Sequence, residues 1–438
     1  MIDIELLRRE PAKVEENLGR RRNPAYLALL AQVRTKDSAW RESVREADRL
    51  RALRNSLGQR IAAARKAGEG ADALLAESKT LPDSLHQVEE KEGLLRRERD
   101  DLLRRVPNLL DPSVPFGLDD RENVVVATWG TPRPAAAGQR PHGEALEELG
   151  FADFDRARRA SGAGFYYLEG PLVLLDLALQ RFALDFLVER GFTPVLPPFL
   201  LRREPYEAVT DLADFENVMY KIDGDDLYLI ATSEHPLAAL YQGEILDEAT
   251  VPIRLVGLST NFRREIGGHG VDQKGIFRVH QFTKVEQFVF CRPEESPAIH
   301  EELRSNAEEI FRRLEVPYRV VNVCTGDVGT VAAKKYDVEA WFPRQQAFRE
   351  VVSCSNCTDY QARSLGIRLG RAGRPGKTVP HTLNSTAVAT SRAMAVIVEQ
   401  YQQPDGRIEV PKVLRPYLGG REHLVGVRPR APGSDPAS

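Results

Sequence analysis

Residues 261–287 read NFRREIGGHGVDQKGIFRVHQFTKVEQ, and this stretch predicts how the larger part of the chain folds. A strand ending at Glu265, a loop and a second strand from Ile276 would form a long antiparallel hairpin. Because side chains alternate between the two faces of a strand, one face of the second strand should carry a set of functional groups. The loop contains Gly267, Gly268, Gly270 and Gly275, and the predicted face carries Arg278, His280, Phe282, Lys284 and Glu286.

The groups on this face suit a site for a nucleotide and an amino acid. The guanidinium of Arg278 can pair with a phosphate or a carboxylate, and the ring of Phe282 can stack on a base. The carboxylate of Glu286 suits an ammonium group. The alternative, a solvated face of an edge hairpin, is the weaker interpretation because so many functional groups share the face.

Residues 36–105 predict two long helices that form an antiparallel hairpin. Gly68 and Gly70 mark the reversal between them, and at 1.5 Å per residue the arm would extend ~40 Å. Pro82 predicts a kink or a restart of the second helix. Apolar residues recur every three or four positions in the first helix (Trp40, Val44, Ala47, Leu50, Leu53, Leu57, Ile61, Ala64) and every seven in the second (Leu74, Leu81, Val88, Leu95, Leu102).

The first helix is basic between Arg41 and Lys66, with eight basic residues against three acidic ones. These charges are either a solvated face that keeps the hairpin soluble or a track for a phosphate backbone, and composition alone leaves both open.

We expect residues 1–107 to form a helical N-terminal domain, 108–142 a linker and 143–426 the main folded domain, followed by a disordered tail at 427–438. The linker is rich in Pro, Gly and Asp, with a strand-like run at Val124–Thr128.

The composition is that of an ordinary globular protein, with 42% hydrophobic and 29% charged residues. The first 22 residues lack the apolar core of a signal peptide, and charged residues interrupt the apolar run Leu172–Leu187, which predicts a core helix. We therefore expect a cytoplasmic protein without a membrane span. The net charge of −3 carries no information about partners.

Four cysteines in a chain of this length do not indicate a disulfide framework. Cys354 and Cys357 are spaced as a CxxC pair, whereas Cys291 and Cys324 are isolated. A zinc site needs further ligands. We expect buried reduced thiols and no zinc.

Five sequence blocks resemble the seryl-tRNA synthetases. Arg263 and Glu265 fit the Arg-x-Glu of class II motif 2, and HTLNSTAVATSR at 381–392 is similar to motif 3. The other three blocks are Leu179–Leu200, which is similar to motif 1, TSEHP at 232–236 and FREVVSCSNCTDYQAR at 348–363. The hairpin at 36–105 matches the N-terminal arm of that family.

The resemblance implies an α+β fold, in which an antiparallel sheet is flanked by helices and an N-terminal coiled-coil arm precedes the catalytic domain at 143–426. It implies a serine–tRNA ligase that uses ATP with Mg²⁺, activates L-serine to seryl-adenylate and serves tRNA(Ser) and tRNA(Sec) as a homodimer.

The resemblance also implies roles for individual residues. Arg263 would bridge the serine carboxylate and the α-phosphate, Phe282 would stack on adenine, and Arg392 would hold the γ-phosphate. The implied serine-binding residues are Thr232, Ser233, Glu234, Arg263, Glu286 and Thr386. The implied ATP-binding residues are Arg263, Arg264, Glu265, Arg278, Val279, Phe282, Glu350, Val351, Val352, Ser353 and Arg392, with Glu350 and Ser353 also holding Mg²⁺.

Thr232 could instead cap the helix that follows it, and Asp359 with Arg363 is expected to be a structural ion pair. Four other functions stay open: a catalytically silent synthetase-like protein, an activator that loads a carrier protein, a class II synthetase for another amino acid, and a specialised second copy that supplies seryl-tRNA to a biosynthetic pathway.

Overall fold

The computed structural model describes residues 1–210, 215–265, 275–371 and 378–426. The chain divides into two compact units, Met1–Pro107 and Asn108–Ser438, and each has a hydrophobic cluster of its own. Of the predicted glycine-rich loop, only Glu265 and Gly275 at its ends fall within the described residues, so Gly267, Gly268 and Gly270 lie outside them.

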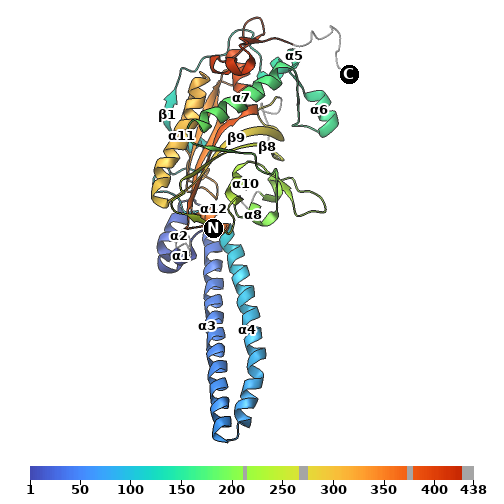
Figure 1. The fold of residues 1–438 in the computed structure, drawn as a ribbon. Coiled ribbons are helices and arrows are strands. Elements are labelled where there is room, and N and C mark those ends of the chain that lie inside the picture. Colours follow the sequence, from blue (N-terminus) through green and yellow to red (C-terminus); the bar gives the residue numbers. More distant parts are fainter. Residues whose placement is uncertain (211–214, 266–274, 372–377, 427–438) are drawn as a thin grey trace, which may run out of the picture. The chain divides into compact units, whose positions relative to one another are not determined.

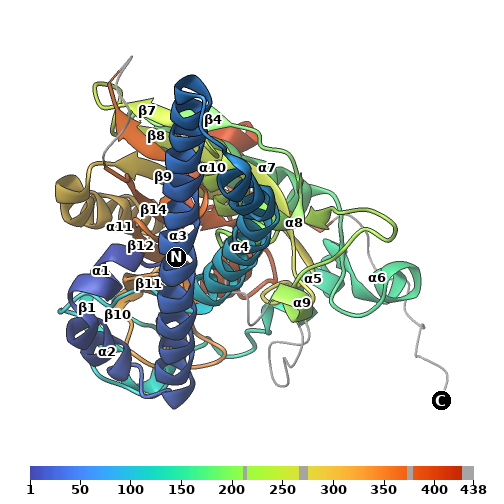
Figure 2. The same cartoon turned by 90° about the horizontal axis from the view of Figure 1, so that it is seen from below.

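The first unit is a helical hairpin preceded by two short helices. The long helices α3 and α4 lie side by side and antiparallel (Figures 1 and 2), which confirms the predicted hairpin. The chain reverses at Gly68, whose φ of 75° favours glycine. The bounds are α1 (Ile4–Arg9), α2 (Pro11–Gly19), α3 (Pro24–Ala67) and α4 (Asp72–Arg105). The first long helix thus begins well before Lys36, because Asn23 caps it and Pro24 suits its first turn.

Helix α4 runs through Pro82 without the predicted restart. Leu81 and Leu85, on either side of the proline, are buried against Ala47, Leu50 and Leu57 of α3. Packing on both sides therefore holds the helix together where proline removes a backbone hydrogen bond. Leu74, Val88, Leu95 and Leu102 of the predicted seam are only half-buried.

A buried charge cluster joins three of these helices. Asp37 of α3 accepts hydrogen bonds from Arg8 of α1 at 2.6 and 2.9 Å and lies 3.3 Å from Arg99 of α4. Arg99 also covers the ring of Trp40, 4.4 Å from its centroid. Burial alone would raise the pKa of Asp37, but the hydrogen bonds and charges of Arg8 and Arg99 together outweigh it and leave that pKa lowered. The cluster fixes where α3 and α4 meet.

The second unit is built on an eight-stranded sheet in the order β1-β10-β11-β12-β14-β9-β8-β4. All neighbours are antiparallel except β4 and β8, and this confirms the predicted α+β fold. The strands are β1 (Val124–Trp129), β4 (Thr193–Val195), β8 (Ile253–Phe262), β9 (Gln281–Cys291), β10 (Tyr318–Asn322), β11 (Lys334–Phe342), β12 (Ala347–Thr358) and β14 (His381–Ala389).

The second strand of the predicted hairpin begins at Gln281 and not at Ile276. The intervening backbone makes other bonds: Ile276 N donates to the ring of His142, and His280 N donates to Gly164 O. The amides of residues 276 and 280 therefore bond away from β8, although His280 O still accepts from Arg263 N at 2.9 Å.

The predicted linker is wrong in part, because residues 108–142 belong structurally to the second unit. Strand β1 pairs with β10, and Trp129 stacks on Tyr318 with ring centroids 5.9 Å apart. Leu110 and Val114 are buried in a cluster with residues of β10. Although the composition of residues 108–142 is typical of a linker, their apolar side chains pack against the core of the second unit.

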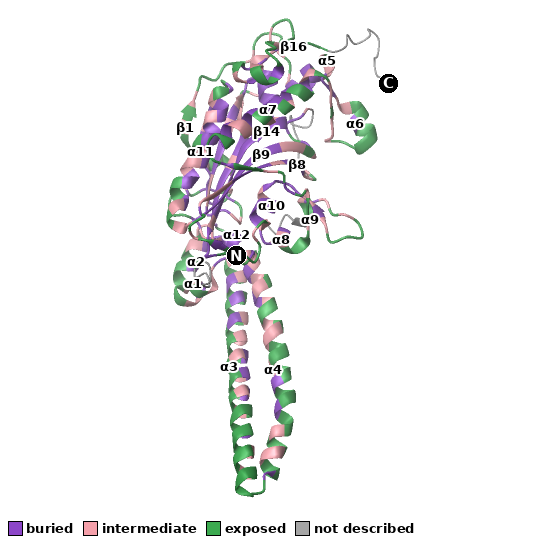
Figure 3. Cartoon of the chain, in the orientation of Figure 1, coloured by how far each residue is buried: buried purple, intermediate pink, exposed green. Residues whose placement is uncertain are grey.

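Helices α7, α11 and α13 pack on one face of the sheet (Figure 1), and α10 and α12 contact part of the other face. Buried side chains of α7, α11 and α13 form one cluster with Val285, Cys354 and Leu383 of the strands, and Figure 3 shows burial concentrated there and sparse on α3 and α4. The helices are α5 (His142–Glu148), α6 (Phe154–Ser161), α7 (Pro171–Val188), α8 (Arg203–Glu207), α9 (Phe215–Val218), α10 (Glu234–Ala239), α11 (Ser296–Arg313), α12 (Tyr360–Ser364) and α13 (Thr390–Tyr401).

Short elements complete the unit. The two-stranded pairs are β2 (Ala152–Asp153) with β3 (Tyr167–Leu168), β5 (Leu200–Leu201) with β6 (Tyr228–Leu229), β7 (Ile245–Asp247) with β13 (Arg368–Gly370), and β15 (Ile408–Glu409) with β16 (His423–Leu424). The 3-10 turns are Asp120–Glu122, Pro293–Glu295 and Lys412–Leu418. Within the described ranges, no helix combines the length and apolar character needed to cross a bilayer.

Candidate active site

A cavity of about 270 Å³ opens on the sheet face opposite α7, α11 and α13. Alternation along the strands produces it: Val285 and Cys354 point into the core, whereas their neighbours Glu286, Ser353 and Ser355 line the cavity. Glu286 of β9 is the cross-strand partner of Thr386 of β14. The register of the sheet thus brings motif 2 and motif 3 residues together.

One end of the cavity is acidic. Lys284 Nζ donates to Thr232 Oγ1 at 2.7 Å and lies 2.7 Å from Glu286 Oε2. The buried Glu286 is therefore ion-paired with Lys284 and also faces Thr386 across the strand pair. Glu234 lines the same end, and Gln361 donates to it at 2.8 Å.

Burial is the largest influence on the pKa values of the two carboxyls at this acidic end. Burial and the nearby Glu286 raise the pKa of Glu234 to about 7, although Lys284 opposes the shift. Burial also raises the pKa of Glu286. Both carboxyls favour an additional cationic ligand, because a bound cation would stabilise their ionised forms.

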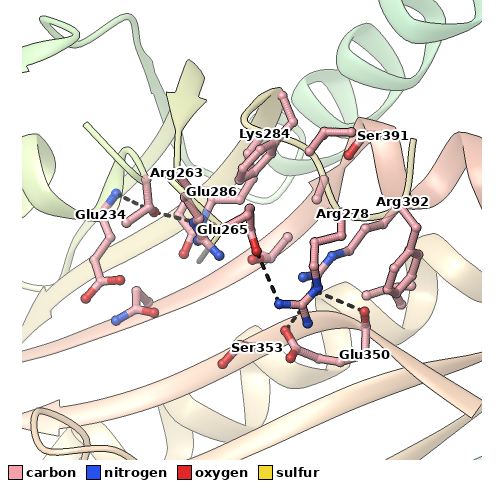
Figure 4. Close-up of a pocket in the computed structure, with 18 of the residues that line it drawn as sticks. Glu234, Arg263, Glu265, Arg278, Lys284, Glu286, Glu350, Ser353, Ser391 and Arg392 are labelled. Carbon is pink, nitrogen blue, oxygen red and sulfur yellow. Dashed lines mark hydrogen bonds and ion pairs between the residues drawn. The ribbon is translucent and has the colours of Figure 1, made fainter. Parts of the chain in front are cut away.

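The other end of the cavity is lined by arginines (Figure 4). Arg392 donates to the backbone and side-chain oxygens of Glu350 at 3.0 and 3.1 Å, and Arg278 donates to Glu265 at 3.2 Å. Arg263 lies between the two ends and covers the ring of Phe282 at 5.2 Å. Three guanidiniums in one cavity suit a polyanion such as a triphosphate.

The charges at this end are coupled. Burial, together with the nearby Arg392, lowers the pKa of Arg263. Burial alone would raise the pKa of Glu350, but Arg392 and Lys335 outweigh it and leave that pKa lowered. Glu350 is therefore ionised at neutral pH and can face a metal cation.

Comparisons with known proteins agree with this arrangement. Residues 218–401 match the family profile "tRNA synthetase class II core domain (G, H, P, S and T)", and residues 1–110 match "Seryl-tRNA synthetase N-terminal domain". The serine–tRNA ligase of Methanospirillum hungatei is 55% identical over 425 residues, which cover 97% of this chain and 100% of that protein. The chain belongs to the seryl-tRNA synthetase family. Its activity is that of a class II serine–tRNA ligase.

Two solved structures of the family match this chain over nearly its full length. The crystal structure of seryl-tRNA synthetase from Pyrococcus horikoshii complexed with ATP has a TM-score of 0.92 and 47% identity, covering 98% of this chain and 100% of that one. The cytoplasmic enzyme from Naegleria fowleri, solved with AMP, has a TM-score of 0.87 and 33% identity over 98% of this chain and 99% of that one.

Most residues expected in a seryl-tRNA synthetase site meet in this cavity. Those that line it are Thr232, Glu234, Arg263, Glu265, Arg278, Val279, Phe282, Glu286, Glu350, Val351, Ser353, Thr386 and Arg392.

Three expected residues do not line the cavity. Ser233 is fully buried beside Gly257, where any larger residue would meet its side chain. Val352 points into the core cluster. Arg264 is exposed and is held by its backbone, which donates to Val218 O. His280, predicted on the same face as Glu286, instead stacks on Phe165 and bonds Tyr220.

The structure also shows the surroundings of Thr232, of the Asp359–Arg363 pair and of the four cysteines. Thr232 does accept from Glu234 N at 3.1 Å, as a cap would, while it also lines the cavity. Arg363 donates to Asp359 at 3.1 Å, which confirms that ion pair. All four cysteines are free and buried, and burial raises the pKa of Cys291 to about 12.

Several lining residues were not predicted from the sequence: Phe277, Ser355, Asn384, Ala389 and Ser391. Lys284, which also lines the cavity, was placed on the correct face but given no role. Period-two alternation from Ser353 predicts Ser355, and from Thr386 it predicts Asn384. Phe277 and Ser391 lie outside the strands, where alternation gives no prediction.

Proposed function

We propose that this cavity condenses L-serine with ATP, with the amino acid at the acidic end and the triphosphate at the arginine end. The observation that carries the proposal is that two buried carboxyls, Glu234 and Glu286, share one cavity of about 270 Å³ with three guanidiniums. The 47% identity to a seryl-tRNA synthetase crystallised with ATP supports it.

Serine recognition would use Glu286, Glu234, Thr232 and Thr386. Glu286 Oε2 is placed to accept from the serine ammonium or hydroxyl, and Thr386 faces it across the strand pair. A substrate without the hydroxyl would leave a buried polar group unpaired, which costs free energy.

Adenylate formation would depend on positioning and charge. Arg263 would hold the serine carboxylate against the α-phosphorus, and Arg392 would hold the departing pyrophosphate. The carboxylate oxygen forms the new bond to phosphorus while the bond to pyrophosphate breaks, and no side chain has to remove a proton. The 3′-terminal ribose hydroxyl of tRNA would then attack the activated carbonyl and release AMP.

Glu350 and Ser353 are the residues that would hold Mg²⁺ with ATP. They supply a carboxylate and a hydroxyl, which are hard oxygen ligands. Behind them, the buried Asp337 Oδ1 has no hydrogen-bond partner among the described residues, and burial raises the pKa of Asp337 to about 7. When bound, Mg²⁺ supplies positive charge to the phosphates.

The hairpin α3–α4 is the proposed tRNA-binding element. Arg41, Arg45, Arg54, Arg60, Arg65 and Lys66 are exposed and form no ion pair within the described part of the chain, whereas Arg49 and Arg51 are neutralised by acidic neighbours. Unpaired exposed cations suit a phosphate backbone. tRNA(Ser) is the proposed substrate, and tRNA(Sec) is a second proposed acceptor; both reactions would take place in the cytoplasm.

A homodimer is proposed on the apolar surface of α7. Val173, Leu174, Leu177 and Val188 are exposed on this helix, and Leu196, just after edge strand β4, is 73% exposed. Such a patch indicates a protein interface. Sedimentation equilibrium should report a dimer that Leu177→Asp weakens; a wild-type monomer at micromolar concentration would overturn the proposal.

Binding measurements on two variants test the assignment of the two ends. Isothermal titration should show that Glu286→Ala weakens serine binding at least ~tenfold and leaves ATP binding unchanged. Arg392→Ala should weaken ATP binding at least ~tenfold and leave serine binding unchanged. If each variant weakened both ligands equally, the two-ended site would be wrong.

A further inference from the structure

A buried pair of residues outside the cavity connects two of its walls. His142 and Glu399 are 3% and 2% exposed, and His142 Nδ1 lies 3.1 Å from Glu399 Oε1. His142 is the first residue of α5, and Glu399 lies on α13, whose other end carries Arg392. The reaction described above uses neither residue.

The histidine holds the backbone where the chain enters the cavity wall. Its Nε2 accepts from Ile276 N at 3.4 Å, so the Nδ1 proton is left to donate to Glu399. Gly275 has a φ of 134°, and a Cβ there would come within 2.2 Å of the ring nitrogen. Glycine at 275 is what allows the ring to approach this closely.

The held segment leads directly to residues of the ATP end. Phe277, Arg278 and Val279 follow Ile276 and line the cavity. Phe277 packs edge-on against Phe342 at 5.2 Å, and Arg392 covers its ring at 5.1 Å. Arg392 therefore rests on the segment that His142 holds.

Residues near both ends of helix α13 contact the segment that His142 holds. Glu399 lies seven residues after Arg392, so the two side chains lie on the same face, about two turns apart. Arg392 contacts Phe277 directly, and Glu399 reaches Ile276 through His142. Glu399 Oε2 also accepts from Arg344 N at 3.2 Å, which fixes the carboxylate.

We propose that the His142–Glu399 pair is a positioning device for the ATP subsite: it sets the backbone at Gly275–Phe277 and thereby the placement of Phe277, Arg278 and Arg392. The inference rests on the proposed assignment of ATP to the arginine end. His142 acts through the Ile276 amide and touches no substrate.

The test compares three variants of His142 by serine-dependent pyrophosphate exchange. His142→Ala should raise the KM for ATP about tenfold, the effect of losing one buried hydrogen bond, and leave the KM for serine within about twofold. His142→Asn can still donate to Glu399 but not reach Ile276, so it should resemble His142→Ala. His142→Gln places an acceptor near the former Nε2 and should recover most of the ATP affinity.

Controls separate this inference from the assignment of the site. Arg278→Ala must weaken ATP binding; if it does not, the ATP assignment itself fails. His381→Ala alters a half-buried histidine that bonds Ser296 away from the cavity, and it should change neither KM. Should His142→Ala not fold, the comparison of His142→Asn with His142→Gln carries the test.

The proposal is overturned if folded His142→Asn keeps the wild-type KM for ATP. It is also overturned if His142→Gln is no better than His142→Ala, or if the KM values for serine and ATP rise together. Thermal unfolding of each variant sets an assay temperature at which all are folded.

Discussion

Thr386 is proposed to contribute its hydroxyl to the recognition of serine. It faces Glu286 across the β14–β9 pair, and its hydroxyl helps to stabilise the ionised Glu286. Thr386→Val keeps the shape and removes the hydroxyl. We expect the serine-over-alanine preference in pyrophosphate exchange to fall at least ~tenfold, with an unchanged KM for ATP.

Thr386→Ser is the matched control, because it keeps the hydroxyl and removes only a methyl group. If Thr386→Val kept the wild-type preference for serine over alanine, Thr386 would have no role in serine recognition.

Glu234 predicts a pH dependence near neutrality. Its pKa is raised from 4.5 to about 7, so the carboxyl is protonated below pH 7 and ionised above it. If the ionised form binds the serine ammonium, kcat/KM for serine should rise as the pH increases through about 7 and level off above it. Glu234→Gln should remove this limb of the profile. An identical limb in both proteins would assign the titration elsewhere.

The same carboxyl affects stability with the opposite sign. In the unfolded chain it ionises near pH 4.5, whereas the folded protein keeps its proton up to about pH 7. Between these values the folded state binds more protons, so the contribution of Glu234 to stability falls as the pH rises.

At the scale of elements, the hairpin can be shortened without disturbing its base. Removing residues 44–87 and bridging with a short glycine-rich linker keeps the cluster of Arg8, Asp37, Trp40 and Arg99. We expect normal serine-dependent pyrophosphate exchange but loss of aminoacylation. The log–log salt slope of tRNA binding should fall by close to one unit for each phosphate group that the shortened protein no longer neutralises.

A full-length variant with Arg41, Arg45, Arg54, Arg60, Arg65 and Lys66 changed to Gln separates charge from shape. This variant should bind tRNA weakly, and the log–log salt slope of its tRNA binding should be shallow. If it or the shortened protein charged tRNA as well as the wild type, the exposed charges would be only a solvated helix face.

Elements with a clear period were predictable from the sequence, and boundaries set by distant contacts were not. The three-and-four spacing predicted α3, the seven-residue spacing predicted α4, and the apolar run Leu172–Leu187 predicted α7 (Pro171–Val188). The start of β9 at Gln281 was missed because His142 and Gly164 take the backbone bonds of residues 276 and 280. Strand β1 was placed in a linker because its partner β10 lies about 190 residues later.

At the scale of the whole molecule, most of the site was predictable because family motifs mark the residues of its strands. Arg263, Glu286, Glu350 and Thr386 all line the cavity. Ser233 and Val352 do not line the cavity: Val352 alternates into the core with its strand, and Ser233, in the turn before α10, is buried beside Gly257. Phe277 was missed because tertiary contacts with Phe342 and Arg392 place it.

One cavity is proposed to select serine and to activate it with ATP. The most direct test is ATP–pyrophosphate exchange by the full-length protein with each of the twenty amino acids in turn. The account predicts rapid exchange with serine and, for alanine, glycine and threonine, rates lower by at least ~100-fold. Exchange driven best by another amino acid, or no exchange with any, would contradict it.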